Sequence, residues 1–197
     1  MPDLVFYEKG HVYMLDGVEL PSVSELCRFL TREVYKDAPR WAMEAAAERG
    51  TAVHKAAQQL DTDGTCEIEE EYLPYLRAYK AFLKAHKVEW SLIESPMHHP
   101  ILNYAGTIDR YGLVDGKWTL VELKTSSVLQ QVLVRAQTNL YRLMLIEKGL
   151  QVEQICALHL KKDGKYRYAP VQISEGLACS LLCLHNTLKK KRRTRNE

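Results

Sequence analysis

Two acidic residues and a lysine occupy positions that one β-hairpin would bring onto a single face. Asp115-Gly116 separates two apolar-rich runs, and this dipeptide is a strong signal for a two-residue hairpin turn. Counting outward from the turn along both strands places Asp109 directly opposite Glu122. Opposed residues of an antiparallel pair point to the same face, with Cβ atoms about 5 Å apart. Lys124 lies two residues beyond Glu122 and therefore shares that face.

This cluster of charges has a chemical use. Directly opposed like charges repel, so a cation between Asp109 and Glu122 would resolve the arrangement, and hard divalent ions prefer oxygen ligands. A divalent ion neutralises the anionic oxygens that shield the phosphorus of a phosphodiester and acidifies a water molecule for in-line attack. The pattern therefore indicates a metal-dependent enzyme that cleaves phosphodiesters. The structural alternative is a solvated surface hairpin in which Lys124 only pairs with the two acids.

Length and composition indicate one soluble domain. The chain has 197 residues, enough to bury a sizeable core. Its hydrophobic content of 46% and charged content of 26% are those of an ordinary globular protein. No apolar run is long enough to span a membrane, and the N-terminus lacks the pattern of a signal peptide. Five cysteines, an odd number, favour reduced thiols, so we expect a cytoplasmic protein with no membrane partner.

The charge is unevenly distributed along the chain. A net charge of +2 is too small to indicate a nucleic-acid partner by itself. The C-terminal end, however, carries six cations in seven residues: Lys189, Lys190, Lys191, Arg192, Arg193 and Arg195. Such a run is a candidate contact for DNA phosphates, and a solvated, frayed end is the alternative. We expect a single domain over 1–197, with an N-terminal hairpin and helix (1–40), a core (41–188) and this basic tail (189–197).

Periodicity and turn signals predict the elements that position the cluster. The expected strands are short strands within 4–20, a strand over 90–95 that stops at Pro96, the hairpin around Asp115-Gly116, and strands over 154–160 and 166–171. The first expected helix follows a cap at Ser22 or Ser24, and two more cover 41–60 and 70–86. A fourth runs from a cap at Ser126 or Ser127 to about 148. The last follows Ser174, with Leu177, Leu181, Leu184 and Leu188 facing inward. This order predicts an α/β or α+β domain, a central mixed sheet flanked by helices.

Four segments together resemble a known superfamily. Gly106-Thr-Ile-Asp109-Arg110 and Val121-Glu-Leu-Lys124-Thr-Ser126 are similar to the acid strand and the Glu-x-Lys strand of PD-(D/E)XK nucleases. Upstream, Arg49-Gly-Thr-Ala-Val-His54 is similar to the histidine helix of the RecB-like, phage-exonuclease branch, and Gln137-x-x-x-Tyr141 is similar to its downstream motif. The resemblance covers about residues 41–172 and implies a restriction-endonuclease-like core. It also implies a DNase of the exonuclease type, acting in DNA recombination, repair or replication.

The resemblance also implies roles for individual residues. The metal, Mg²⁺ or Mn²⁺, would be bound by His54, Asp109, Glu122 and the backbone carbonyl of Leu123. Lys124 would complete the catalytic set with Asp109 and Glu122, and a dication beside it should lower the pKa of its ammonium group. Glu94, Gln137 and Tyr141 are candidates for supporting the site. Arg49 and the basic tail are candidates for contacting DNA, the expected partner, alongside a recombinase, helicase or single-strand-binding protein.

Two other classes of function remain open at this stage. One is a non-catalytic DNA-binding or assembly subunit of the same fold, and the other is a structure-selective endonuclease. An iron–sulfur cluster, which some RecB-like nucleases bind, would require one early and three late cysteines. Only Cys179 and Cys183 lie late, on the face of the last helix that is expected to point inward, so we expect core thiols there.

Overall fold

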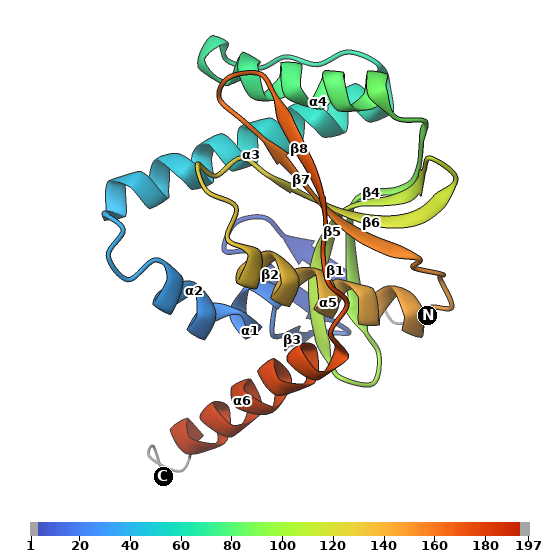
Figure 1. Ribbon diagram of the computed structural model, residues 1–197. Helices are drawn as coiled ribbons and strands as arrows, with labels where there is room; N and C mark the ends of the chain where they lie inside the picture. Colours follow the sequence, from blue (N-terminus) through green and yellow to red (C-terminus); the bar gives the residue numbers. More distant parts are fainter. Residues whose placement is uncertain (1–3, 194–197) are drawn as a thin grey trace.

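The structure, a computed structural model, describes the backbone of residues 4–193 and the side chains of residues 4–189 (Figure 1). It contains two β-sheets and six α-helices within that range. Among the described residues, no helix combines the length and apolar character needed to cross a membrane.

The N-terminal segment forms a three-stranded antiparallel sheet and a capped helix. Strands β1 (Leu4–Tyr7), β2 (Val12–Leu15) and β3 (Val18–Leu20) lie within 4–20, where the sequence predicts short strands. Helix α1 (Val23–Leu26) starts at Ser22, whose hydroxyl accepts a hydrogen bond from the backbone N–H of Glu25. Helix α2 (Arg28–Val34) follows directly.

The main sheet has five strands in the order β4-β5-β6-β7-β8. Neighbouring strands are antiparallel except for β6 and β7, which are parallel and are joined through helix α5 (Gln131–Glu147). The strands are β4 (Val88–His99), β5 (Tyr104–Val114), β6 (Lys117–Lys124), β7 (Gln154–Leu160) and β8 (Tyr166–Pro170). The expected fold class, a central mixed sheet flanked by helices, is therefore confirmed.

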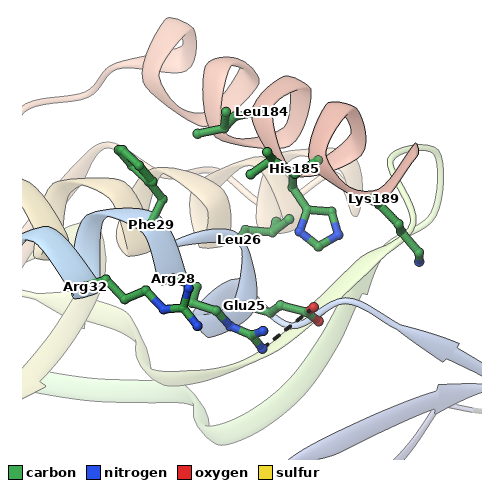
Figure 2. A pocket seen from close by; sticks show the side chains of 9 residues that line it. Glu25, Leu26, Arg28, Phe29, Arg32, Leu184, His185 and Lys189 are labelled. Atoms are coloured by element: carbon green, nitrogen blue, oxygen red, sulfur yellow. Dashed lines mark ion pairs between the residues drawn. The ribbon is translucent and has the colours of Figure 1, made fainter. Parts of the chain in front are cut away.

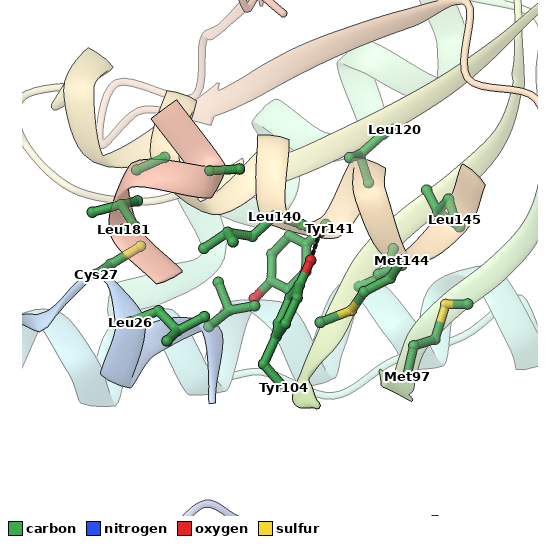
Figure 3. Packing of buried hydrophobic residues seen from close by; sticks show 14 of the residues in the cluster. Leu26, Cys27, Met97, Tyr104, Leu120, Leu140, Tyr141, Met144, Leu145 and Leu181 are labelled. Atoms are coloured by element: carbon green, nitrogen blue, oxygen red, sulfur yellow. Dashed lines mark hydrogen bonds between the residues drawn. The ribbon is translucent and has the colours of Figure 1, made fainter. Parts of the chain in front are cut away.

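Helices cover both faces of this sheet and create two apolar cores. On one face lie α3 (Arg40–Asp63), the short 3₁₀ helix η1 (Glu70–Tyr72) and α4 (Leu73–Ala85), which pack on the sheet through residues such as Val53 and Phe82. On the other face, α5 packs with α1 and with α6 (Glu175–Arg193). Figure 3 shows Leu140, Met144 and Leu145 of α5 in this second core.

Two predicted element ends are wrong. Strand β4 does not stop at Pro96 but continues to His99, with Pro96 paired to Thr107. A proline is tolerated there because β4 is an edge strand, where one missing N–H need not break the ladder. Helix α5 begins at Gln131 rather than after Ser126 or Ser127, and the Ser126 hydroxyl instead donates to the carbonyl of Val128.

The final helix departs from the sequence prediction along its second half. Leu181 is buried against the core, but Leu184 and Leu188 are exposed rather than inward-facing. Leu184 and Leu188 are exposed because the second half of the helix projects beyond the rest of the molecule (Figure 1). The expectation of core thiols at Cys179 and Cys183 is also wrong, because both are exposed and the helix face that packs on the core carries Ala178, Leu181 and Leu182 instead.

Candidate metal and catalytic site

The Asp115-Gly116 turn sets the position of the two candidate acids. Both turn residues have positive φ, 51° and 79°, as a two-residue hairpin turn requires. The predicted register is confirmed from the turn as far as the pair Arg110 and Val121. One step further the hydrogen-bonded ladder ends, and Oδ2 of Asp109 accepts a 2.8 Å hydrogen bond from the backbone N–H of Leu123. Asp109 is therefore held rigidly at the point where the two strands separate.

Three potential metal ligands meet at this point from three elements. His54 comes from the middle of α3, Glu94 from β4 and Asp109 from β5. Nδ1 of His54 lies 3.0 Å from Oε1 of Glu94 and 3.6 Å from Oδ1 of Asp109. One ligand atom from each residue lies within 4.8 Å of the others, a spacing that could hold a metal ion. Glu94, expected only as a supporting residue, thus belongs to the central group.

The backbone of Glu94 has an uncommon conformation. Its φ is 41°, in the left-handed region that non-glycine residues rarely adopt. The register pairs Ile93 with Arg110 and Ser95 with Ile108, so Glu94 lies across from Asp109 between these pairs. Such conformations cost about 1–3 kcal/mol and concentrate at functional sites. Nothing in the local sequence marks this conformation, and the sequence named Glu94 only as a candidate for supporting the site.

A buried arginine connects this group to the protein interior. Arg110 is fully buried, its Nε donates to Oδ2 of Asp61 at 2.7 Å, and its Nη1 donates to Oε1 of Glu94 at 2.9 Å. The Tyr79 hydroxyl donates to the same oxygen of Asp61, and the guanidinium lies 5.8 Å from the Tyr79 ring centroid. The sequence patterns gave no role to Arg110 or Asp61. Asp61 lies one residue beyond the helix expected over 41–60, and only the tertiary structure joins it to Arg110.

Glu122 and Lys124 form a second part of the site. Nζ of Lys124 donates to Oε1 of Glu122 at 2.7 Å, and both side chains are largely buried. The other carboxylate oxygen of Glu122, Oε2, is buried without a hydrogen-bond partner among the described residues. A buried carboxylate oxygen without a donor is costly, and a cation would satisfy it. The residues of the site therefore fit a divalent metal ion, with one imidazole and several carboxylates as donors.

The electrostatics of the site are those of crowded carboxylates. Burial and then the nearby charge of Glu122 raise the pKa of Asp109 to about 7. Burial lowers the pKa of His54, but Asp109 and Glu94 outweigh that effect and raise it to about 9. Burial likewise lowers the pKa of Lys124, whereas Glu122 and Asp109 raise it, and the net result is a raised pKa. Without a metal, Lys124 is therefore a cation, and the lowered pKa expected from sequence would require the dication beside it.

Tyr141 and Gln137 border the site on α5. Tyr141 is buried, and burial followed by the charge of Glu122 raises its pKa well above the ordinary value, so it is a neutral phenol. Its ring packs against Gly106, where a Cβ atom would lie only 2.7 Å from Cε1 of Tyr141. Gly106 is thus required by this close approach. Gln137 and Lys124 both line an adjacent open pocket of about 350 Å³.

The remaining candidates are Arg49, Leu123 and the basic tail. Nε of Arg49 donates to the carbonyl of Thr125 at 3.2 Å, so Arg49 joins α3 to the end of β6. Leu123 lies between Glu122 and Lys124 and pairs with Leu158 of β7. Lys189 is exposed near the end of α6. The side chains of Lys190, Lys191, Arg192 and Arg193, and the whole of Arg195, lie outside the described residues.

Comparisons with known proteins leave the activity open. No protein-family profile matches the chain, and no curated protein matches it. Among solved structures, the chain is similar to an alkaline exonuclease, LHK-Exo, from Laribacter hongkongensis, at 16% identity over 88% of this chain and 93% of that chain, with a TM-score of 0.37. The structure of LHK-Exo in complex with dAMP is also similar, at 17% identity over 89% of this chain and 94% of that chain, with a TM-score of 0.37. Similarity at this level does not assign an activity, which has to come from the side chains of the site.

Proposed function

We propose that the protein is a metal-dependent DNase of the exonuclease type, a RecB-like or phage-type member of the PD-(D/E)XK superfamily. One observation carries this proposal. His54, Glu94 and Asp109 converge beside the buried pair of Glu122 and Lys124, and Glu122 keeps a buried oxygen with no donor among the described residues. This set combines ligands for a dication with a fixed ammonium group. DNA would be its substrate, in recombination, repair or replication within the cytoplasm.

Each side chain has a defined task in this proposal. His54, Glu94, Asp109 and Glu122, with the carbonyl of Leu123, would hold Mg²⁺ or Mn²⁺. When bound, the ion neutralises phosphate charge and activates water. The hydrogen bond from the Leu123 N–H fixes Asp109, and Arg110 fixes Glu94, so these two ligands are positioned in advance, whereas His54 must give up its contact with Glu94 through Nδ1 or bind the ion through Nε2.

Lys124 would act on the phosphate rather than on the metal. Its ammonium group is held by Glu122 at 2.7 Å and lines the open pocket next to the ligands. A fixed cation at this place stabilises the negative charge that develops on the phosphate in the transition state. Gln137, which lines the same pocket, would orient the DNA backbone, and the neutral phenol of Tyr141 would donate a hydrogen bond.

A non-catalytic DNA-binding subunit is the competing function. Such a protein would gain nothing from several buried carboxylates, since they repel a DNA phosphate. A structure-selective endonuclease is the second competitor, and it would use the same ligands.

Incubation of linear and covalently closed circular DNA with the protein, with and without Mn²⁺, separates these functions. Loss of linear DNA alone, and only with Mn²⁺, supports the exonuclease. Nicking of circles identifies an endonuclease. The Asp109→Asn variant, purified in parallel, serves as the matched control for contaminating nucleases. Loss of neither DNA from a folded, Mn²⁺-loaded protein would identify the non-catalytic subunit.

A further inference from the structure

A second groove lies between α2 and the second half of α6, and Arg28 and Arg32 line both this groove and the open pocket beside Lys124. Figure 2 shows Phe29 of α2 and Leu184 of α6 on opposite sides of it, with Leu26 between them. Leu188 adds to this apolar lining. The cavity has a volume of about 270 Å³, just below the range of about 300–1,000 Å³ that is usual for small-molecule sites. Its size therefore suits one or two bulky side chains rather than a cofactor.

Three of the apolar side chains that line this groove are exposed in the described structure. Phe29 is 59% exposed, Leu184 37% and Leu188 47%. Earlier in the same helix, Ala178 and Leu181 are buried in the core. The apolar face of α6 thus continues past the part of the protein that covers it. Clustered exposed apolar side chains of this kind mark binding surfaces.

Cations surround the apolar lining. Arg28 and Arg32 line the groove from α2, and Lys189 lines it from α6 (Figure 2). Glu25 is the one acidic residue of the lining. Its Oε1 lies 3.8 Å from Nη2 of Arg28, so Glu25 offsets the charge of Arg28. Arg32 and Lys189 have no ion-pair partner among residues 4–189. The rim therefore carries uncompensated positive charge, which favours an anionic partner.

We propose that this groove docks an acidic peptide segment of a partner protein. A bulky apolar side chain of the segment inserts between Phe29 and the leucines of α6, and its carboxylates contact Arg32 and Lys189. This interaction lies beyond the proposed nuclease activity and does not depend on it.

Two other occupants fit the surface less well. A second copy of the chain would bring the same cations to the contact, and like charges would repel. A single DNA strand would match the cations and could stack one base on Phe29, but Leu26, Leu184 and Leu188, the other apolar residues of the lining, offer no aromatic face to a neighbouring base. Only an acidic segment with an apolar anchor uses both the charge and the apolar lining.

Fluorescence anisotropy with the full-length protein tests the proposal without any cleavage assay. The probe is the peptide GSEDDELF with an N-terminal fluorescein. We expect saturable binding that weakens at high salt. The peptides GSEDDESS, without the apolar end, and GSKRKKLF, with reversed charge, should each bind at least about tenfold more weakly, since removal of an anchor or a charge pair commonly costs this much.

Variants locate the binding site. Leu188→Ser and Lys189→Glu should each weaken binding of the peptide about tenfold, because they remove the apolar wall and reverse the charge of the rim. Ile146→Ser is the matched control, since Ile146 is also a partly exposed residue, 40%, on a different helix. Circular dichroism checks that each variant is folded, and unchanged melting of Leu188→Ser is expected because Leu188 is outside the core.

Three outcomes would overturn the proposal. The first is no saturable binding of GSEDDELF to the wild-type protein. The second is binding that Leu188→Ser and Lys189→Glu leave unchanged. The third is binding of a labelled twelve-nucleotide oligothymidylate that both variants weaken while the peptide does not compete, which would assign the groove to DNA. Since none of these readouts involves cleavage, their failure is independent of the proposed function.

Discussion

Replacement of Arg110 by methionine tests the central electrostatic feature of the site. Removing one partner of a buried ion pair costs about 3–5 kcal/mol, because the opposite charge stays buried without compensation. Here Asp61 and Glu94 both lose their arginine. Asp61 keeps the Tyr79 hydroxyl and Glu94 keeps His54, so we expect the lower end of the range, about 3 kcal/mol.

Urea unfolding followed by circular dichroism at pH 7 measures this loss. With a denaturant slope of about 2 kcal/mol/M, the midpoint should fall by about 1.5 M. Lys36→Met is the matched control, since the exposed pair of Lys36 with Glu33, at 3.2 Å, contributes at most about 1 kcal/mol. Its midpoint should therefore move by no more than about 0.5 M.

A second substitution distinguishes the loss of a charge pair from a simple packing defect. Asp61→Asn should destabilise the wild-type protein, because it weakens the interaction with Arg110. In the Arg110→Met background it should restore part of the missing stability, because it removes a buried charge that no longer has a partner. A midpoint shift for Arg110→Met no larger than that of Lys36→Met, or equal effects of Asp61→Asn in both backgrounds, would refute the reasoning.

The remaining predictions concern the metal, the catalyst and the tail. Asp109→Asn and Glu122→Gln should each abolish cleavage and weaken Mn²⁺ binding in calorimetry while the fold persists. Equal Mn²⁺ affinity in the wild type and in both variants would remove both acids from the site. Lys124→Met should eliminate turnover but retain Mn²⁺ and DNA binding, and near-normal turnover would make Lys124 a structural partner only. Mn²⁺ affinity should rise between pH 7 and pH 9, because His54, with a pKa of about 9, must lose its proton before the imidazole can bind a metal; a flat profile would contradict this role. Deletion of 189–197 should leave the melting temperature nearly unchanged and flatten the salt dependence of DNA affinity by roughly 0.9 for each phosphate that the tail neutralises, whereas an unaltered slope would identify a solvated end.

The candidate site was partly predictable because part of it is local. Asp115-Gly116 specifies a turn that only a few backbone conformations can make, and the turn fixes the register of everything between Val114 and Arg110. Counting along the strands therefore brought Asp109 and Glu122 near each other correctly. The predicted pairing of Asp109 opposite Glu122 is absent from the ladder, and the Asp109 side chain accepts a hydrogen bond from the Leu123 N–H just beyond the last pair.

The rest of the site depends on contacts between distant segments. Asp61 meets Arg110 only after α3 has packed on the sheet, and Glu94 takes its left-handed conformation where β4 passes Asp109. Asp61 and Arg110 are 49 residues apart in the sequence, and Glu94 and Asp109 lie on different strands, so neither contact follows from a local pattern.

Helix α6 shows a different limit of sequence analysis. The spacing of Leu181, Leu184 and Leu188 correctly indicates one apolar face. Periodicity identifies such a face, but it does not tell how much of its length the neighbouring elements cover. The core ends after Leu182, which leaves the last two leucines of the stripe exposed.

The two outer strands of the main sheet carry a consequence for solubility. An edge strand offers unpaired backbone groups to any other chain, and this invites aggregation of the protein into extended sheets. Strands β4 and β8 are the edges, and each contains a proline, Pro96 and Pro170. A proline gives an incoming strand no N–H at its position, and the register of β4 is also irregular between Trp90 and Leu92. Each edge of the main sheet therefore offers an incoming strand fewer N–H donors, which disfavours strand addition.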